Sequence, residues 1–301
     1  MRLRLGGRRL ELGARPLLMG VVNATPDSFS DGGGLRDLEA RVARGAALLE
    51  AGADLLDVGG ESARGDRPPV AADVEAERVV GVVERLCALG ATVSVDTHKL
   101  PVAEAAIAAG AALVNDVSGL RDLALADLCA RTGAGLVLMH TRVPPKGTRL
   151  DPRAYDDVVA DVAAFLGERI ELAVGRGVHA EQLLLDPGPD FAKTPAQTVA
   201  VLRRLDALHA FGRPVLLAVS RKDVVGAITG RSPHERLAGT LAALGEGVDA
   251  GAQVLRVHDV AAARDFLAVR AVLRGERQLT PTEGLTPDRY PDGPPPGLAL
   301  G

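Results

Sequence analysis

Short apolar runs recur along the chain, and each ends in polar residues before a longer segment with apolar residues at helical spacing. The runs cover residues 17–22, 54–58, 92–96, 113–117, 135–139, 183–186, 215–219 and 254–257. Runs this apolar are typical of parallel strands that are covered on both faces. The pattern therefore predicts eight strands in a parallel sheet.

Segments of helical period follow the strands in strict alternation. They cover residues 38–51, 71–89, 101–109, 124–132, 160–175, 195–210, 233–250 and 261–273. Alternating strands and helices imply parallel pairing through crossovers, and eight such units favour a (β/α)8 TIM barrel. A doubly wound open sheet is the alternative fold, because periodicity does not show whether a sheet closes.

The two ends of the chain have different patterns. Residues 3–12 alternate apolar and polar side chains around Gly6 and Gly7, which predicts an N-terminal β-hairpin that would close the bottom of the barrel. Prolines and glycines are frequent near the other end. We expect one barrel domain over residues 1–278 and an irregular tail over residues 279–301.

Composition and charge narrow the class of protein. The 301 residues are 47% hydrophobic with a formal net charge of −4, which argues against binding to nucleic acid or anionic membranes. Any anionic ligand must therefore meet a local group of cations. Cys87 and Cys129 show no metal-ligand spacing and are expected to be buried free thiols. With no signal peptide or membrane span expected, a cytoplasmic protein is predicted.

Polar or ionisable side chains stand at the end of every predicted strand. They are Asn23, Asp57, Asp96, Asn115, His140, Asp186, Ser220 with Arg221 and Lys222, and Arg256 with His258. One such residue would be explained as a helix cap. In a barrel the strand ends meet at one face, so polar residues at eight ends predict a ligand site there.

The chemistry of these side chains suggests two kinds of ligand group. Carboxylates and an amide, at Asp96, Asn115 and Asp186, can pair with a planar heterocycle that displays N–H and C=O groups. Arg64, Arg256 and the other cations suit a pyrophosphate or a carboxylate. The sequence therefore predicts a heterocycle pocket deep in the barrel and an anion site near its rim.

Seven motifs, in order along the chain, resemble the signatures of dihydropteroate synthases. They are MGVVNATPDSFSDGG (19–33), DVGGESAR (57–64), SVDT (94–97), NDVSG (115–119), DPG (186–188), SRK (220–222) and RVHD (256–259). The resemblance implies a transferase of folate biosynthesis that joins 6-hydroxymethyl-7,8-dihydropterin pyrophosphate to 4-aminobenzoate. It also implies that pyrophosphate leaves first, that the enzyme uses Mg²⁺, that it is a homodimer, and that sulfonamides target it.

The same resemblance implies a role for individual residues. The pterin would be bound by Asp96, Asn115, Asp186 and Lys222, and the pyrophosphate by Asn23, Arg64, Arg256 and His258. Mg²⁺ would be bound by Asn23 and Asp31, and 4-aminobenzoate by Ser220, Arg221 and Phe191. Catalysis would fall to Asp96, Lys222 and Arg256.

Departures from the family pattern concern the side of the second substrate. Ala63 stands where the family usually has threonine, Gly65 and Asp66 replace a Pro-Gly pair, and Pro189-Asp190 replaces an apolar residue and glycine ahead of Phe191. Two other functions stay open on the sequence. One is a pterin-binding methyltetrahydrofolate–corrinoid methyltransferase, and the other is a pterin-binding homologue without catalysis.

Overall fold

The computed structural model describes residues 1–13, 15–25, 35–62, 67–147 and 150–280. Within them, eight parallel strands form one sheet in the order β8-β7-β6-β5-β4-β3-β10-β9. The strands are β3 (Leu17–Asn23), β4 (Leu55–Gly59), β5 (Val93–Asp96), β6 (Leu113–Asp116), β7 (Gly135–Met139), β8 (Leu183–Asp186), β9 (Leu216–Leu217) and β10 (Val254–Val257). Each strand lies beside the next along the chain, and the helices provide the crossovers between them.

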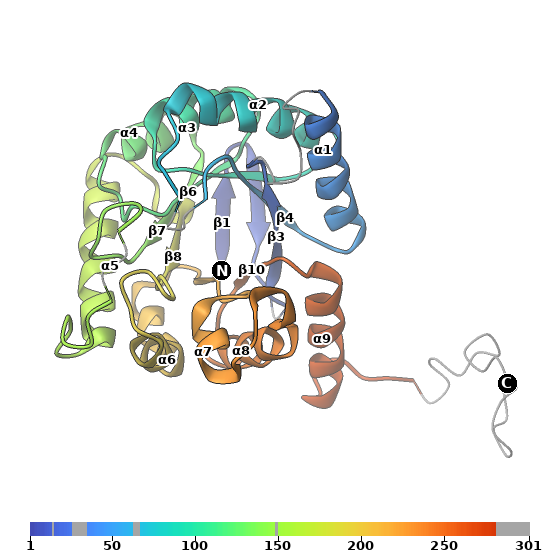
Figure 1. Cartoon of the computed structure of the whole chain (residues 1–301), viewed down its shortest axis with the longest axis vertical. Helices are drawn as coiled ribbons and strands as arrows, with labels where there is room; N and C mark the ends of the chain where they lie inside the picture. The colour runs from blue at the N-terminus through green and yellow to red at the C-terminus, as the bar shows by residue number, and fades with distance from the viewer. Residues whose placement is uncertain (14, 26–34, 63–66, 148–149, 281–301) are drawn as a thin grey trace, which may run out of the picture.

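The helices form a ring outside the strands (Figure 1). They are α1 (Leu35–Glu50), α2 (Ala72–Ala88), α3 (Leu100–Ala108), α4 (Ala124–Thr132), α5 (Val158–Gly175), α6 (Pro195–Arg203), α7 (Asp223–Thr229), α8 (Leu237–Asp249) and α9 (Val260–Leu273). Local sequence sets several of their ends. Thr194 caps α6 in a capping box with Gln197, and Gly133 ends α4 in the left-handed conformation with φ of 76°.

The two edges of the sheet meet. Leu185 of β8 forms a parallel bridge with Val215, and its N–H donates to the carbonyl of Pro214 at 2.9 Å. Directly after this bridge, β9 pairs with β10, with Leu216 opposite Val254. The predicted barrel is therefore confirmed, and the open sheet is excluded.

Strand side chains alternate between the helix layer and the inside of the barrel. In β4, Leu56 and Val58 pack in the large cluster under the helices, whereas Leu55 packs inside the barrel. Equivalent residues of other strands complete this inner layer: Met19, Leu113, Val137, Leu184, Leu216 and Val254. Because side chains fill the barrel here, the space for a ligand lies beyond this layer, toward the strand ends.

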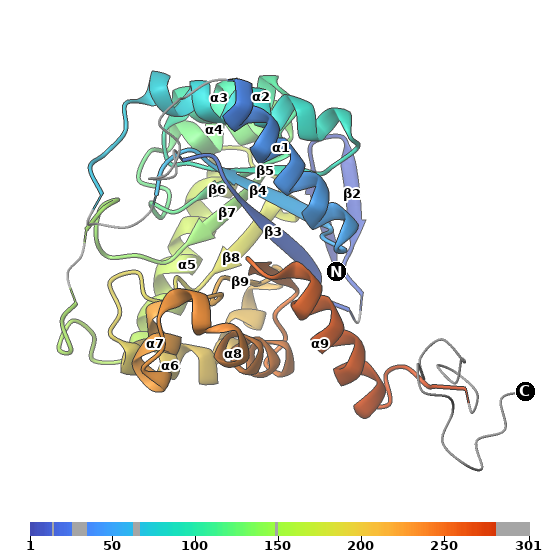
Figure 2. The same cartoon turned by 45° about the vertical axis from the view of Figure 1, so that its right-hand side comes forward.

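A hairpin covers the other end of the barrel (Figure 2). It consists of β1 (Arg2–Leu5) and β2 (Arg8–Glu11), with Gly6 in the turn at φ of 61°. Leu3 and Leu5 are fully buried in the inner cluster, next to the starts of the barrel strands. Arg8 adds a hydrogen bond to Thr92, at 2.9 Å. The predicted hairpin is thus present and closes the bottom.

Three predicted elements differ in the structure. The run at 215–219 pairs as a continuous strand only over Leu216–Leu217, with Val215 in a single bridge to Leu185, and the chain then reaches a left-handed residue at Arg221, whose φ is 59°. The helix predicted over 195–210 breaks at Arg204 and continues as a 3-10 helix, η2 (Leu205–Phe211). The one predicted over 233–250 begins as a separate 3-10 turn, η3 (Pro233–Glu235), ahead of α8. Another 3-10 turn, η1 (Ala180–Gln182), precedes β8.

Other sequence expectations meet the structure in part. Cys129 is a buried and Cys87 a half-buried free thiol, and burial raises the pKa of Cys129 to about 12. Among the helices of the described ranges, none has the length and apolar character needed to cross a membrane. The predicted tail lies outside the described residues beyond Thr280.

Candidate active site

Strand geometry brings the predicted polar residues to one level of the barrel. Asp57, Asn115 and Asp186 each follow, by two positions, a residue of the inner apolar layer. A spacing of two keeps a side chain on the same face of a strand, one step closer to its carboxyl end. Arg256 stands in the same relation to Val254. The barrel interior therefore changes from an apolar layer to a polar layer above it.

Arg256 connects two carboxylates in this polar layer. Its Nε donates to Oδ2 of Asp57 at 2.6 Å, and its Nη2 donates to Oδ2 of Asp96 at 2.7 Å. Asp57 also accepts a hydrogen bond from Nδ2 of Asn115 at 3.0 Å. Four strands, β4, β5, β6 and β10, are thus joined through their side chains at the floor of the site.

The floor keeps free hydrogen-bond acceptors. Oδ1 of Asp57 and Oδ1 of Asn115 are buried, and neither has a hydrogen-bond partner within the described part of the chain. An unpaired buried acceptor is costly, so such groups are expected to meet a ligand that supplies donors. N–H groups on the edge of an amino-substituted heterocycle are donors of this kind.

Burial and neighbouring charges shift the pKa values of the floor. Burial raises the pKa of Asp96 to about 7, against the opposing effect of Arg256, and the Asp57 carboxylate raises it further. Burial by itself would lower the pKa of Arg256, but Asp57 and Asp96 raise it overall. Arg256 therefore stays charged, while Asp96 changes its charge near neutral pH.

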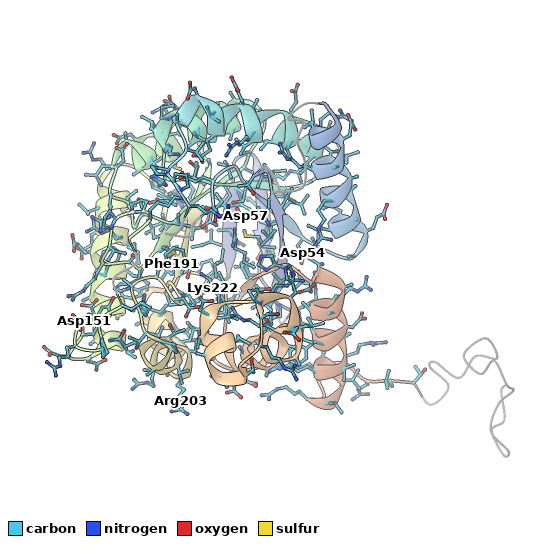
Figure 3. All side chains as sticks on the ribbon, viewed as in Figure 1. Asp54, Asp57, Asp151, Phe191, Arg203 and Lys222 are labelled. Carbon is cyan, nitrogen blue, oxygen red and sulfur yellow. The ribbon has the colours of Figure 1, made fainter. Side chains whose placement is uncertain are left out.

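Asp186 and Lys222 form the opposite wall. Burial raises the pKa of Asp186 and lowers that of Lys222. Oδ1 of Asp186 accepts a hydrogen bond from the N–H of Gly188 at 2.7 Å. The Lys222 ammonium donates to the carbonyl of Pro189 at 3.2 Å and lies 4.3 Å from the ring centroid of Phe191. In Figure 3, Asp57, Phe191 and Lys222 all lie within the ring of helices.

A second group of residues lies where β9 and β10 end. Oγ of Ser220 accepts from the N–H of His258 at 3.2 Å and lies 3.0 Å from its Nδ1. Burial, with help from Arg256, lowers the pKa of His258 to about 4, so the imidazole is neutral at pH 7. Arg221 forms a bidentate ion pair with Asp259, at 3.0 and 2.7 Å. The guanidinium predicted to meet a substrate carboxylate therefore already has a carboxylate partner.

Asn23 ends β3 with an exposed side chain, opposite Gly59 in the sheet register. Arg64, Asp31, Ala63, Gly65 and Asp66 lie outside the described residues. Of the two residues predicted to bind Mg²⁺, Asn23 is therefore the one that the structure describes. The other predicted residues of the site, from Asp96 to His258, all come from the strand ends or the loops that follow them.

A cleft opens beside the polar layer. Asp96, Thr97, His98 and Phe191 line it together with a segment of the loop after β7, residues 143–147. Lys146 of that loop bonds to Ser62 and pairs with Glu61, which also binds Lys99 at 2.6 Å. The cleft therefore leads from the floor carboxylate to the loops on the rim.

Two residues at the site, Asp57 and Lys193, have no individual role predicted from the sequence. Asp57 stands at a predicted strand end, and its spacing of two from Leu55 was a signal that it shares the interior face with Asp96. Lys193 gave no signal, because a lysine in a loop is normally solvated. It is instead almost fully buried beneath the loop that carries Phe191.

Comparison with known proteins identifies the family. The family described as pterin binding enzyme matches residues 19–258. The dihydropteroate synthase of Bacillus subtilis is 40% identical over 82% of this chain and 84% of its own. The Xanthomonas albilineans dihydropteroate synthase with 4-aminobenzoic acid is 46% identical, with a TM-score of 0.84 over 91% of this chain and 99% of its own. The same enzyme in complex with 7,8-dihydropteroate is 45% identical, with a TM-score of 0.81 over 91% of this chain and 99% of its own. This chain belongs to the dihydropteroate synthase family.

Proposed function

We propose that the chain condenses 6-hydroxymethyl-7,8-dihydropterin pyrophosphate with 4-aminobenzoate to give 7,8-dihydropteroate and pyrophosphate. The observation that carries this proposal is the polar floor, where Arg256 links Asp57 and Asp96 beside unpaired acceptors of Asp57 and Asn115. Relatives with the same fold bind 4-aminobenzoic acid and 7,8-dihydropteroate. Membership of the family supports the same reaction here.

The pterin lies, in this proposal, between the floor and the opposite wall. Asn115 and Asp186 pair with its amino-pyrimidine edge, and Lys222 donates to its carbonyl side. Asp96 in its ionised form stabilises positive charge that develops on the pterin as the leaving group departs. Arg256 holds Asp96 in place, which gives it a role in catalysis as well as near the pyrophosphate.

The pyrophosphate lies at the rim, near Asn23, Arg64 and His258. Because Nδ1 of His258 faces Ser220, its Nε2 is the atom that can donate to a phosphate oxygen. In the first step the bond between the pterin methylene carbon and the pyrophosphate oxygen breaks, and the electron pair leaves with the pyrophosphate. In the second step the aryl amine forms a C–N bond to that carbon and releases a proton.

Asn23 and Asp31 would hold Mg²⁺ together with the phosphate oxygens. The exposed amide of Asn23 at the end of β3 fits this task, because Mg²⁺ in phosphate-binding sites takes few protein oxygens and completes its shell with phosphate and water. When bound, the ion neutralises charge on the leaving group. Loss of pyrophosphate-substrate affinity on chelation with EDTA, measured by calorimetry, tests this assignment. Unchanged affinity without Mg²⁺ would count against it.

The second substrate binds, we infer, between Phe191 and Ser220. Arg221 can reach its carboxylate only by loosening the ion pair with Asp259. Sulfonamides that imitate 4-aminobenzoate are expected to inhibit in competition with it. We also infer that the protein is a cytoplasmic homodimer. Sedimentation equilibrium would measure the mass of the assembly in solution.

Turnover by the purified protein tests the function. With Mg²⁺ and both substrates, pyrophosphate release should require 4-aminobenzoate and should match the dihydropteroate formed. If the protein released no pyrophosphate and preferred methyltetrahydrofolate as a ligand, it would be a methyltetrahydrofolate–corrinoid methyltransferase and not a synthase. Tight pterin binding without turnover would indicate a non-catalytic homologue.

A further inference from the structure

Lys193 is almost fully buried and has no role in the proposed chemistry. Only 1% of the residue is exposed. Its ammonium donates to three backbone carbonyls, those of Gly188 at 2.9 Å, Phe191 at 3.2 Å and His140 at 3.3 Å. Buried lysines are rare unless their charge is compensated, so this position requires an explanation.

The three carbonyls join two parts of the barrel rim. His140 follows β7, whereas Gly188 and Phe191 belong to the loop after β8. At Gly188, where φ is 64°, an added Cβ would lie 2.1 Å from the carbonyl oxygen of His140. The two backbones therefore approach so closely that only glycine fits, and the ammonium of Lys193 lies against that contact.

The loop that Lys193 holds has an unusual backbone. Asp190 and Ala192 are not glycines, yet their φ values are 65° and 52°. Such conformations persist only where surrounding contacts maintain them. Asp190 is held from outside by the N–H of Val224 and the hydroxyl of Thr198. Lys193 provides the corresponding support from inside.

The opposite side of this loop faces the substrates. The Phe191 ring lies 4.3 Å from the Lys222 ammonium, and the Pro189 carbonyl accepts from the same ammonium at 3.2 Å. Phe191 and Lys222 lie together inside the ring of helices (Figure 3). The position of the Phe191 ring therefore depends on a backbone whose carbonyl is bound to Lys193.

We propose that Lys193 is a positioning residue, which fixes the Phe191 ring for 4-aminobenzoate by binding three backbone carbonyls with its three N–H groups. The inference rests on the proposed function and assigns to that site a residue that does not touch substrate. It also makes the shape of the 4-aminobenzoate site depend on the protonation of the Lys193 amine. A neutral amine offers only two N–H donors, so one carbonyl must be released when the proton leaves.

The surroundings set the pH at which this occurs. Burial lowers the pKa of Lys193 to about 7, against the opposing effect of Asp186. Lys222 lowers it further and Asp190 raises it, while His140, whose pKa burial lowers to about 2, is neutral and adds no charge. The third hydrogen bond from Lys193 to the loop carbonyls is therefore lost progressively as pH rises through about 7.

The test compares Lys193→Met with a matched control. Methionine has similar volume but no donor, so KM for 4-aminobenzoate should rise at least about tenfold, since misplacement by about 1 Å can cost far more. The dissociation constant of the pterin pyrophosphate, measured by calorimetry, should change less than about twofold. Gln182→Met is the control. Gln182 is also buried, and its Nε2 donates to two backbone carbonyls, those of Cys129 at 2.9 Å and Ala134 at 2.6 Å, but it lies ahead of β8, at the opposite end from the site. The control variant should lower stability and leave both constants unchanged.

A second measurement uses the wild-type enzyme and does not depend on how the variant folds. KM for 4-aminobenzoate should rise as pH passes from 6 to 9, and this rise should vanish in Lys193→Met. A flat profile in the wild type, or equal KM values in wild type and Lys193→Met at pH 6, would overturn the inference and leave the proposed function standing. A wild-type protein without turnover would overturn both.

Discussion

At the scale of single residues, the central feature is one guanidinium between two carboxylates. Arg256 is half-buried, and its partners Asp57 and Asp96 lie 2.6 and 2.7 Å away. Removal of one member of such a group leaves uncompensated charge in a poorly solvated place. The geometry therefore makes Arg256 necessary for the shape of the floor as well as for its charge.

Arg256→Ala should fold but lose substrate affinity and activity. The loss of charge-assisted hydrogen bonds worth about 1.5–3 kcal/mol corresponds to a fall in kcat/KM of about 10- to 150-fold. Steady-state kinetics and circular dichroism measure the two effects. Arg264→Ala, which removes an exposed pair with Asp265, is the control and should keep wild-type kinetics. Unchanged kcat/KM in Arg256→Ala would refute the assigned role.

Activity should also depend on the protonation of Asp96. Because burial raises the pKa of Asp96 from 3.8 to about 7, the carboxylate is protonated in the free enzyme below that pH. We expect kcat/KM for the pterin substrate to rise through about pH 7 and then level off. Asp96→Asn should be slower and lack this step. If Asp96→Asn showed an equal rise of kcat/KM near pH 7, the titration would belong to another group.

The same shift predicts a change in stability with a definite sign. The raised pKa means that the folded protein binds a proton more tightly than the unfolded chain. Its stabilising contribution is complete below pH 3.8 and is lost as pH rises through about 7. Urea unfolding between pH 5 and 8 should show the wild type losing stability relative to Asp96→Asn. A constant difference would contradict this linkage.

At the scale of elements, the hairpin supports the barrel from below and takes no part in the site. Leu5 is fully buried among strand side chains, and a Cβ on Gly135 would lie 2.5 Å from its Cδ2. The hairpin therefore fills space that the barrel strands leave at their starting ends.

Leu5→Ala should lower stability and leave catalysis nearly intact. A buried leucine replaced by alanine typically costs about 2–5 kcal/mol, because it leaves a cavity as well as losing apolar contact. Urea denaturation measures this cost, and Val269→Ala on the exposed side of α9, where 60% of the residue is exposed, should stay within about 0.5 kcal/mol. Equal stability of the two variants would show that the hairpin does not fill the barrel.

Much of the element pattern follows from sequence, because buried parallel strands leave uninterrupted apolar runs. The runs at 135–139, 183–186 and 254–257 match β7, β8 and β10. Helix α7 was missed because its seven residues are too few for a clear helical period. The shortened β9 could not be predicted, since its length depends on pairing with its neighbours β8 and β10 and not on its own apolar run.

At the scale of the whole molecule, the site joins residues that are far apart in sequence. Arg256 and Asp57 are separated by 199 positions and still share a hydrogen bond. Strand ends and motifs predict which residues meet at the polar layer. They do not predict which atoms pair, because pairing depends on strand register and side-chain conformation. The Arg221–Asp259 pair and the buried Lys193 are findings of this kind.

A crystal structure with bound pterin pyrophosphate would show whether the polar layer is the pterin site. We expect a pterin ring between Asn115 and Asp186, hydrogen-bonded to the unpaired acceptors at the floor, with the phosphates near Asn23 and His258. Phe191 should remain open to the second substrate. A pterin bound outside the polar layer, or phosphates lying over Phe191, would contradict this expectation.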